Sequence, residues 1–173
     1  MLEIRRHLFL TGEKQVGKST LLRRLIEAKK LDCAGYETQA FFIGGERRGF
    51  TLHGRIEMPP FENDCICCVR IHQRKSIAIP EVFDHNGVSI LTESLACQSP
   101  YLLMDEIGKL ECGAERFCAQ VLEALDGSKR VLGVLQQCDA PLPDAIKARP
   151  DVTVLTVTPE NRDELLAAIL QAY

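Results

Sequence analysis

Near its start the chain contains a glycine-rich octapeptide with the spacing G-x-x-x-x-G-K-S, at residues 12–19. It follows a short apolar run at residues 7–10 that suits a buried strand, and it precedes an amphipathic stretch that suits a helix. This pattern is typical of a phosphate-binding loop, in which glycines let backbone N–H groups point at phosphate oxygens. The positive end of the following helix favours the same anion. The strand, loop and helix together predict an α/β fold.

The polar residues of this loop have separate expected roles. Lys18 is expected to reach the β- and γ-phosphates and to act in catalysis, and Ser19 is expected to bind Mg²⁺. The residues expected to bind the nucleotide phosphates are Gly12, Glu13, Lys14, Gln15, Val16, Gly17, Lys18, Ser19 and Thr20.

Length and charge exclude several other classes of protein. A chain of 173 residues can bury one substantial core and is too short to favour two, so we expect one domain over residues 1–173. No apolar run approaches the length of a membrane span, and the chain starts without an apolar signal segment, so we expect a cytoplasmic protein with no membrane partner. A formal net charge of -3 argues against a specific nucleic-acid partner. The oligomeric state is left open.

Apolar runs alternate with helical patterns along the chain. Residues 36–52 predict a β-hairpin that reverses at Gly44 and Gly45. Uninterrupted apolar strands that alternate with helices predict a mostly parallel sheet with helices on both faces. The other expected elements are extended runs at 65–71 and 77–82, a turn at 84–87, a helix at 88–97, a strand at 101–104, a helix at 114–125, a strand at 130–136, a helix at 144–148, a strand at 152–157 and a last helix from Pro159.

Two acidic residues, Asp105 and Glu106, directly follow the expected strand at 101–104. Ligands of an open parallel sheet bind at the carboxyl ends of its strands, where the phosphate loop also lies. We expect Asp105 to complete the Mg²⁺ site begun by Ser19, and Glu106 to orient or deprotonate a water molecule that attacks the γ-phosphate. The alternative interpretation is that the two acids only end the strand.

Three cysteines and a histidine lie close together: Cys65, Cys67, Cys68 and His72. Thiolates and imidazole are zinc ligands, so this cluster is a possible zinc site. However, the stronger pattern of two C-x-x-C pairs is absent, and a strand would place Cys65 and Cys67 on one face and Cys68 and His72 on the other. We therefore favour a core strand over zinc binding or a redox role.

Segments from nearly the whole chain resemble the cancer-related nucleoside-triphosphatase family, whose members are small single-domain RecA-like P-loop proteins. The resemblance rests on residues 9–21, 35–38, 46–50, 103–111, 131–133 and 157–163. It implies a three-layer α/β/α fold with an added β-hairpin. It also implies Mg²⁺-dependent hydrolysis of ATP, GTP and other nucleoside triphosphates to diphosphate and phosphate, with water activated by Glu106. Asn161 and Arg162 are expected near the base, although Thr158 and Asn161 also suit a helix start.

The chain departs from the family at Val134, where a threonine is usual. Gln136 or Gln137 are candidates to replace the contact of that threonine with the γ-phosphate.

Three cations, Arg48, Lys109 and Arg149, are candidates for neutralising charge in the transition state, with solvated surface positions as the alternative. The same loop and sheet also serve a nucleotide or small-molecule kinase, and a nucleotide-responsive accessory or switch protein with slow turnover is a third possibility. Glu106 beside the metal-binding Asp105 favours water as the acceptor, and thus a hydrolase.

Overall fold

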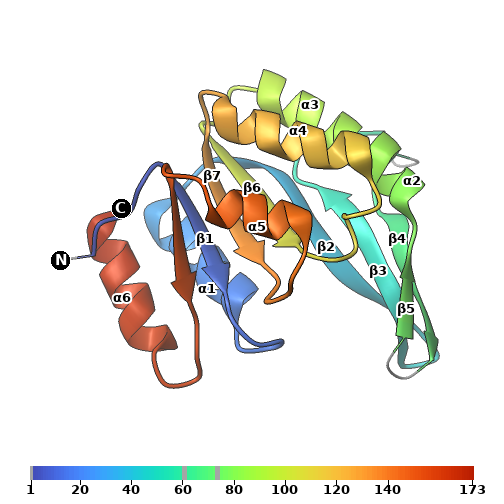
Figure 1. Cartoon of the computed structure of the whole chain (residues 1–173), viewed down its shortest axis with the longest axis horizontal. Coiled ribbons are helices and arrows are strands. Elements are labelled where there is room, and N and C mark those ends of the chain that lie inside the picture. The colour runs from blue at the N-terminus through green and yellow to red at the C-terminus, as the bar shows by residue number, and fades with distance from the viewer. Residues whose placement is uncertain (1, 60–61, 73–74) are drawn as a thin grey trace.

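The computed structural model describes residues 2–59, 62–72 and 75–173 (Figure 1). Its strands form one eight-stranded sheet in the order β5-β4-β3-β2-β6-β7-β1-β8. In chain order the elements are β1 (His7–Thr11), α1 (Lys18–Lys29), β2 (Cys33–Ile43), β3 (Glu46–Gly54), β4 (Cys65–His72), β5 (Lys75–Ala78), α2 (Pro80–Val82), the π-helical turn η1 (Phe83–Gly87), α3 (Val88–Ala96), β6 (Tyr101–Ile107), α4 (Glu115–Asp126), β7 (Arg130–Leu135), α5 (Pro141–Lys147), β8 (Val152–Thr156) and α6 (Arg162–Ala172).

The strands β2, β6, β7, β1 and β8 run parallel to one another. Their carboxyl ends therefore lie along one edge of the sheet, at the bottom of Figure 1. Strand β7 separates β1, which leads into the phosphate loop, from β6, which carries Asp105 and Glu106. The expected mostly parallel α/β fold is confirmed.

The antiparallel part of the sheet is larger than the single hairpin that the sequence predicts. Strands β2 and β3 form that hairpin, and both Gly44 (φ +60°) and Gly45 (φ +82°) adopt the left-handed conformation that a tight two-residue reversal needs. Strands β4 and β5 then continue the sheet beyond β3. Among the described residues, the large exposed hydrophobic side chains all lie on the antiparallel strands: Phe42, Ile43, Ile66, Val69, Ile71 and Ile77.

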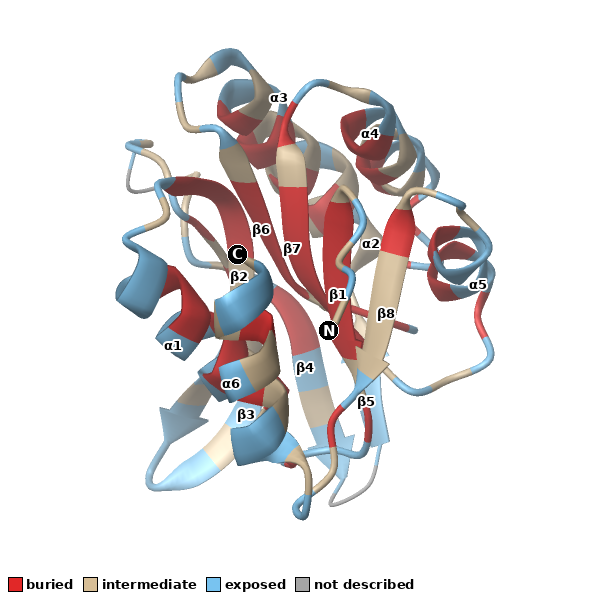
Figure 2. Ribbon diagram, turned by 90° about the vertical axis from the view of Figure 1, so that its left-hand side faces the viewer, coloured by how far each residue is buried: buried red, intermediate tan, exposed pale blue. Residues whose placement is uncertain are grey.

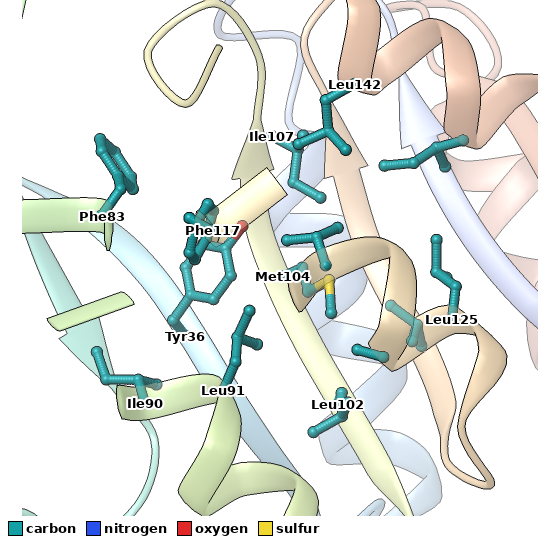
Figure 3. Close-up of a cluster of buried hydrophobic side chains, with 14 of the residues drawn as sticks. Tyr36, Phe83, Ile90, Leu91, Leu102, Met104, Ile107, Phe117, Leu125 and Leu142 are labelled. Atoms are coloured by element: carbon teal, nitrogen blue, oxygen red, sulfur yellow. The ribbon is translucent and has the colours of Figure 1, made fainter. Parts of the chain in front are cut away.

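Helices cover both faces of the parallel strands (Figure 2). Helices α1 and α6 bury one apolar cluster against the sheet, and α3, α4 and α5 bury the other. The second cluster contains an aromatic group in which Phe117 packs between Tyr36 and Phe83 (Figure 3). No helix among the described residues is long and apolar enough to cross a membrane. A cytoplasmic location stays a prediction from the sequence.

Several expected boundaries were wrong. Only Lys75–Ala78 of the expected run at 77–82 is a strand, because Pro80 opens helix α2. No turn interrupts residues 84–87, which instead join α2 to α3, and Asp84 accepts a hydrogen bond from the backbone N–H of Phe117 at 2.9 Å. Helix α5 already begins at Pro141, since proline at a first helical position loses no N–H bond.

The last helix begins at Arg162 rather than at Pro159. The N–H of Thr158 donates to the side chain of Asn161 at 2.9 Å, and the Thr158 hydroxyl accepts from the N–H of Asn161 at 3.3 Å. These two bonds form a closed turn ahead of the helix, so the helical pattern starts later than the proline suggests.

Candidate functional site

The phosphate loop occupies the turn between β1 and α1, and two of its glycines are required by geometry. Gly12 has φ +136°, and a Cβ atom there would collide with the carbonyl oxygen of Val157. Gly17 immediately precedes helix α1 with φ +103°. L-residues with side chains rarely adopt these backbone angles, so the two glycines fix the path of the loop toward the start of the helix.

Lys18 is the first residue of α1, and its side chain lies against the loop. It is 6% exposed, and its ammonium group donates to the carbonyl oxygens of Gly12 at 3.1 Å and Glu13 at 2.8 Å. The positive charge is therefore held between the loop backbone and the start of the helix. A phosphate group seated on the loop meets this charge together with the backbone N–H groups.

Ser19 and Asp105 are brought together from the two motifs. The Ser19 hydroxyl donates to the Asp105 carboxylate at 2.9 Å. Asp105 is buried, and burial raises the pKa of its carboxyl above the ordinary value, while the bond from Ser19 acts in the opposite direction. A hydroxyl and a carboxylate beside a phosphate-binding loop are hard oxygen ligands, and they fit Mg²⁺ by their chemistry.

Glu106 lies next to this pair in the chain. Burial raises the pKa of its carboxyl, whereas the positive charges of Lys18 and Lys14 lower it and the charge of Asp105 raises it. Among the described residues, the Glu106 carboxylate has no hydrogen-bond or ion-pair partner, so it is available to a ligand. A carboxylate with a raised pKa near bound phosphate suits a general base.

A further acid near Ser19 and Asp105, Glu37, was not identified from the sequence. It pairs in register with Asp105 across β2 and β6, and its charge raises the pKa of the Asp105 carboxyl. Arg55 lies 3.7 Å from Glu37 and balances that charge. The one available signal was that Glu37 falls within the segment 35–38 that resembles the family, but no spacing pattern assigns it a role.

A cavity of about 330 Å³ lies over the loop. It is lined by Gly12, Glu13, Lys14, Lys18, Gln136 and Gln137. The two glutamines follow the carboxyl end of β7, between the strands that carry the two motifs. Val134, in contrast, is fully buried in the core on the α1 side. The polar groups that β7 brings to the cavity are therefore Gln136 and Gln137.

A second hollow of about 150 Å³ lies on the other side of the loop, against α1 and α6. Its lining residues are Gly17, Thr20, Leu21, Arg24, Arg162 and Asp163. Arg162 thus faces a recess beside Thr20, the last residue of the predicted phosphate-binding set. The side chain of Asn161 is engaged elsewhere: it accepts from the N–H of Thr158 and donates to the carbonyl oxygen of Thr156, both at 2.9 Å.

The three other candidate cations lie in different places. Arg48 pairs with Glu46 on the antiparallel hairpin at 3.1 Å. Arg149 binds Asp126 and Asp151, and Asp151 bonds the start of β1, so Arg149 lies at the amino edge of the sheet rather than at the phosphate loop. Lys109 is nearer, because its backbone N–H donates to the side chain of Gln136, which lines the cavity.

The structure does not gather the four possible zinc ligands. Cys67 and Cys68 are both fully buried in β4, Cys65 is half-buried and His72 is exposed. A shift in register between Phe50 and Thr51 of β3 breaks the expected alternation of faces. Within residues 2–59, 62–72 and 75–173, no three His, Cys, Asp or Glu side chains are placed to hold a metal ion together. Cys67 and Cys68 form part of the core, as the favoured interpretation expects, whereas Cys65 does not.

Similarity to known proteins agrees with this geometry and confirms the resemblance seen in the sequence. The human protein named cancer-related nucleoside-triphosphatase is 30% identical, in an alignment that covers 95% of each chain. A protein from Thermotoga petrophila named nucleoside-triphosphatase THEP1 is also 30% identical, over 94% of this chain and 90% of its own. The crystal structure of THEP1 from Aquifex aeolicus matches with a TM-score of 0.74 at 25% identity, over 95% of this chain and 97% of that one. A profile described as NTPase matches residues 7–170, and the chain therefore belongs to this family of nucleoside-triphosphatases.

Proposed function

We propose that this enzyme hydrolyses nucleoside triphosphates, ATP and GTP among them, to the diphosphate and phosphate in a reaction that depends on Mg²⁺. The observation that carries the proposal is the 2.9 Å hydrogen bond between Ser19 and Asp105, with Glu106 adjacent in the chain. This bond joins a phosphate-binding loop to a carboxylate pair, which is the combination that phosphoryl transfer to water needs.

The two recesses beside the loop suggest the orientation in which the nucleoside triphosphate binds. The cavity near Lys18 and Gln136 is lined by charged and amide side chains and lies on the side of β7, so we place the terminal phosphate and the attacking water there. The hollow beside Thr20 and Arg162 lies on the opposite side, so we place the nucleoside there. Arg162 thus contacts the nucleoside, and Asn161 holds the turn that presents it.

The chain's own residues then have distinct tasks. Loop N–H groups and Lys18 bind the phosphates and stabilise the negative charge that develops on them. Ser19 and Asp105 would hold Mg²⁺, which when bound neutralises phosphate charge and orients the β- and γ-phosphates.

Glu106 accepts a proton from water, and the water oxygen attacks the γ-phosphorus while the bond to the bridging β–γ oxygen breaks. The products are the nucleoside diphosphate and inorganic phosphate.

The relatives favour hydrolysis over transfer to a metabolite, since both compared sequences have names that describe nucleoside-triphosphatases. The chain also lacks an Asn/Thr-Lys-x-Asp guanine motif, so we propose a broad base preference.

The test is phosphate release from ATP and from GTP by the purified protein, with Mg²⁺ and with chelator. Lys18→Ala, which removes the buried ammonium from the loop, serves as the inactive comparison. Release that requires Mg²⁺ and disappears in Lys18→Ala supports the proposal. Absence of Mg²⁺-dependent release from the wild type contradicts it, and transfer of phosphate to an added small-molecule hydroxyl in place of water favours the kinase alternative.

A further inference from the structure

One buried acid lies close to the site but has no role in the mechanism above. Glu111, which follows β6 in the turn before α4, is 1% exposed. Its carboxylate accepts a hydrogen bond from the backbone N–H of Gly108 at 2.7 Å. A bond from an N–H to a carboxylate is stronger than one between neutral groups, so Gly108 is firmly held.

Three consecutive residues directly after Glu106, Ile107 to Lys109, are each held by a backbone hydrogen bond, and Gly108 is the middle one. The carbonyl oxygen of Ile107 accepts from the N–H of Gln136 at 2.8 Å, and the N–H of Lys109 donates to the Gln136 side chain at 3.2 Å. Glu111 supplies the bond between these two. The chain leaving β6 is therefore fixed by Gln136, which follows β7, and by Glu111 from its own turn.

This backbone determines where the Glu106 carboxylate lies, because among the described residues no hydrogen bond or ion pair holds that carboxylate itself. A general base must lie within hydrogen-bond reach of its water, and small displacements cost much of its effect. We propose that Glu111 is a positioning residue, which holds the turn at Gly108 so that Glu106 is directed at the attacking water. The inference rests on the proposed hydrolysis.

The surroundings of Glu111 show that an ionised carboxylate has a large desolvation cost at this position. Burial raises the pKa of the Glu111 carboxyl to about 7, and its charge in turn raises the pKa of the buried Tyr36 and Cys67. A group that only filled this part of the core could be apolar and avoid that desolvation. The carboxylate provides what an apolar side chain cannot, namely an acceptor for the N–H of Gly108.

Two substitutions at Glu111 separate the effect of side-chain length from the effect of charge. Glu111→Gln keeps the side-chain length and an acceptor oxygen but removes the charge. Glu111→Asp keeps the charge, but its carboxylate is one methylene too short to occupy the same place. Glu115→Gln changes an exposed acid in the first turn of α4 and is the matched control. For each variant, kcat and KM for ATP are measured with Mg²⁺, and the folded fraction is determined by thermal unfolding.

If Glu111 acts by positioning, Glu111→Asp lowers kcat about tenfold or more with KM within about twofold of the wild type, because the turn loses its hold on Glu106. Glu111→Gln then keeps kcat within about threefold of the wild type, and so does Glu115→Gln. The opposite order, with the Asp variant active and the Gln variant slow, overturns positioning in favour of a charge effect. Changes in stability alone, with kcat per folded molecule unchanged in both variants, overturn it in favour of a structural role.

The outcome for the wild type separates this inference from the function on which it rests. A wild type that releases no phosphate contradicts the proposed hydrolysis and the positioning role together. An active wild type with an equally active Glu111→Asp variant contradicts the positioning role alone. Should the Asp variant fail to fold, a Gln variant that folds but has lost more than about tenfold in kcat contradicts the inference by itself.

Discussion

Ser19 donates a 2.9 Å hydrogen bond to Asp105, across 86 positions of the sequence. The contact forms because β1 and β6 run parallel and end at the same edge of the sheet, with only β7 between them. The first residues of α1 and the last residues of β6 therefore meet at one place. Two separate sequence motifs thereby contribute oxygen atoms to one site.

Removing the hydroxyl or the carboxylate charge should lower turnover at fixed Mg²⁺. For Ser19→Ala and Asp105→Asn we expect phosphate release to fall by about 100-fold, because the first variant loses an oxygen ligand and the second loses the negative charge that binds the metal. The Mg²⁺ concentration that gives half-maximal release should rise in both. The measurement is a titration of phosphate release with Mg²⁺ at saturating ATP.

The chain offers a matched control for this pair. Ser99 donates to Asp32 at 2.9 Å, a bond of the same chemistry. Ser99 lies just before the start of β6, away from the loop. Ser99→Ala should leave both turnover and the Mg²⁺ requirement within about twofold of the wild type, as surface changes usually do. Equal losses in the Ser19 and Ser99 variants would mean that the effect comes from the fold and not from the metal site.

Glu106 should control the acid side of the pH profile. Burial raises the pKa of its carboxyl above the ordinary value of 4.5. A general base works only when ionised, so kcat should fall as the pH is lowered through this raised pKa. Glu106→Gln should reduce kcat about 100-fold or more and remove that acid limb. The check is kcat between pH 4.5 and 8.5, and a retained limb in Glu106→Gln would assign it to another group.

The course of the parallel strands could be predicted from the sequence because their signals are local. Apolar runs such as 101–104 and 152–157 are flanked by helical patterns, and the loop spacing fixes the first turn. The approach of Ser19 to Asp105 and the position of Lys18 against the loop could be predicted for the same reason. Each belongs to a short motif whose chemistry needs that residue type at that spacing.

Other features depend on contacts between distant segments, which a single sequence does not encode locally. Glu37 comes beside Asp105 only through the pairing of β2 with β6. Glu111 is recognisable as buried only once the turn after β6 has folded onto Gly108. The π-helix at Phe83–Gly87 was mistaken for a chain reversal because Asp, Asn and Gly usually mark one, whereas here Asp84 accepts a hydrogen bond from the start of α4.

The hollow beside Thr20 should affect substrate binding rather than chemistry. Arg162 lines it, together with Arg24, which lies 3.5 Å from Asp163. For Arg162→Ala we expect KM for ATP to rise about tenfold with kcat within about twofold, because contacts to the nucleoside are the same in the ground and transition states. Arg48→Ala, on the hairpin, is the control. A fall in kcat at unchanged KM would place Arg162 at the phosphates instead.

Glu111 should make stability depend on pH in a direction that can be worked out. Its pKa is about 7 in the folded protein against 4.5 ordinarily, so the folded state holds this proton more tightly than the unfolded chain. The stabilisation is complete below pH 4.5, is lost progressively as the pH rises to about 7, and amounts to about 3 kcal/mol. Glu111→Gln lacks this dependence.

The free energy of unfolding of Glu111→Gln, relative to the wild type, should therefore increase by about 3 kcal/mol between pH 4.5 and pH 8. Taking the difference between the two proteins cancels the titration of the other groups. Urea unfolding at several pH values measures it. A difference that stays constant over this range would show that Glu111 titrates normally in the folded protein.

Tyr36→Phe should not destabilise the protein, although Tyr36 is fully buried. The ring packs against Phe117 with centroids 5.5 Å apart, and phenylalanine keeps that contact. The hydroxyl has no hydrogen-bond partner among the described residues, so its removal relieves an uncompensated desolvation cost. We expect the free energy of unfolding to rise by about 1 kcal/mol.

Phe117→Leu, which removes the ring partner, should instead lower it by about 1 kcal/mol or more. Urea unfolding at one pH compares all three proteins. A loss of stability in Tyr36→Phe would reveal that the hydroxyl has a hydrogen-bond partner in solution.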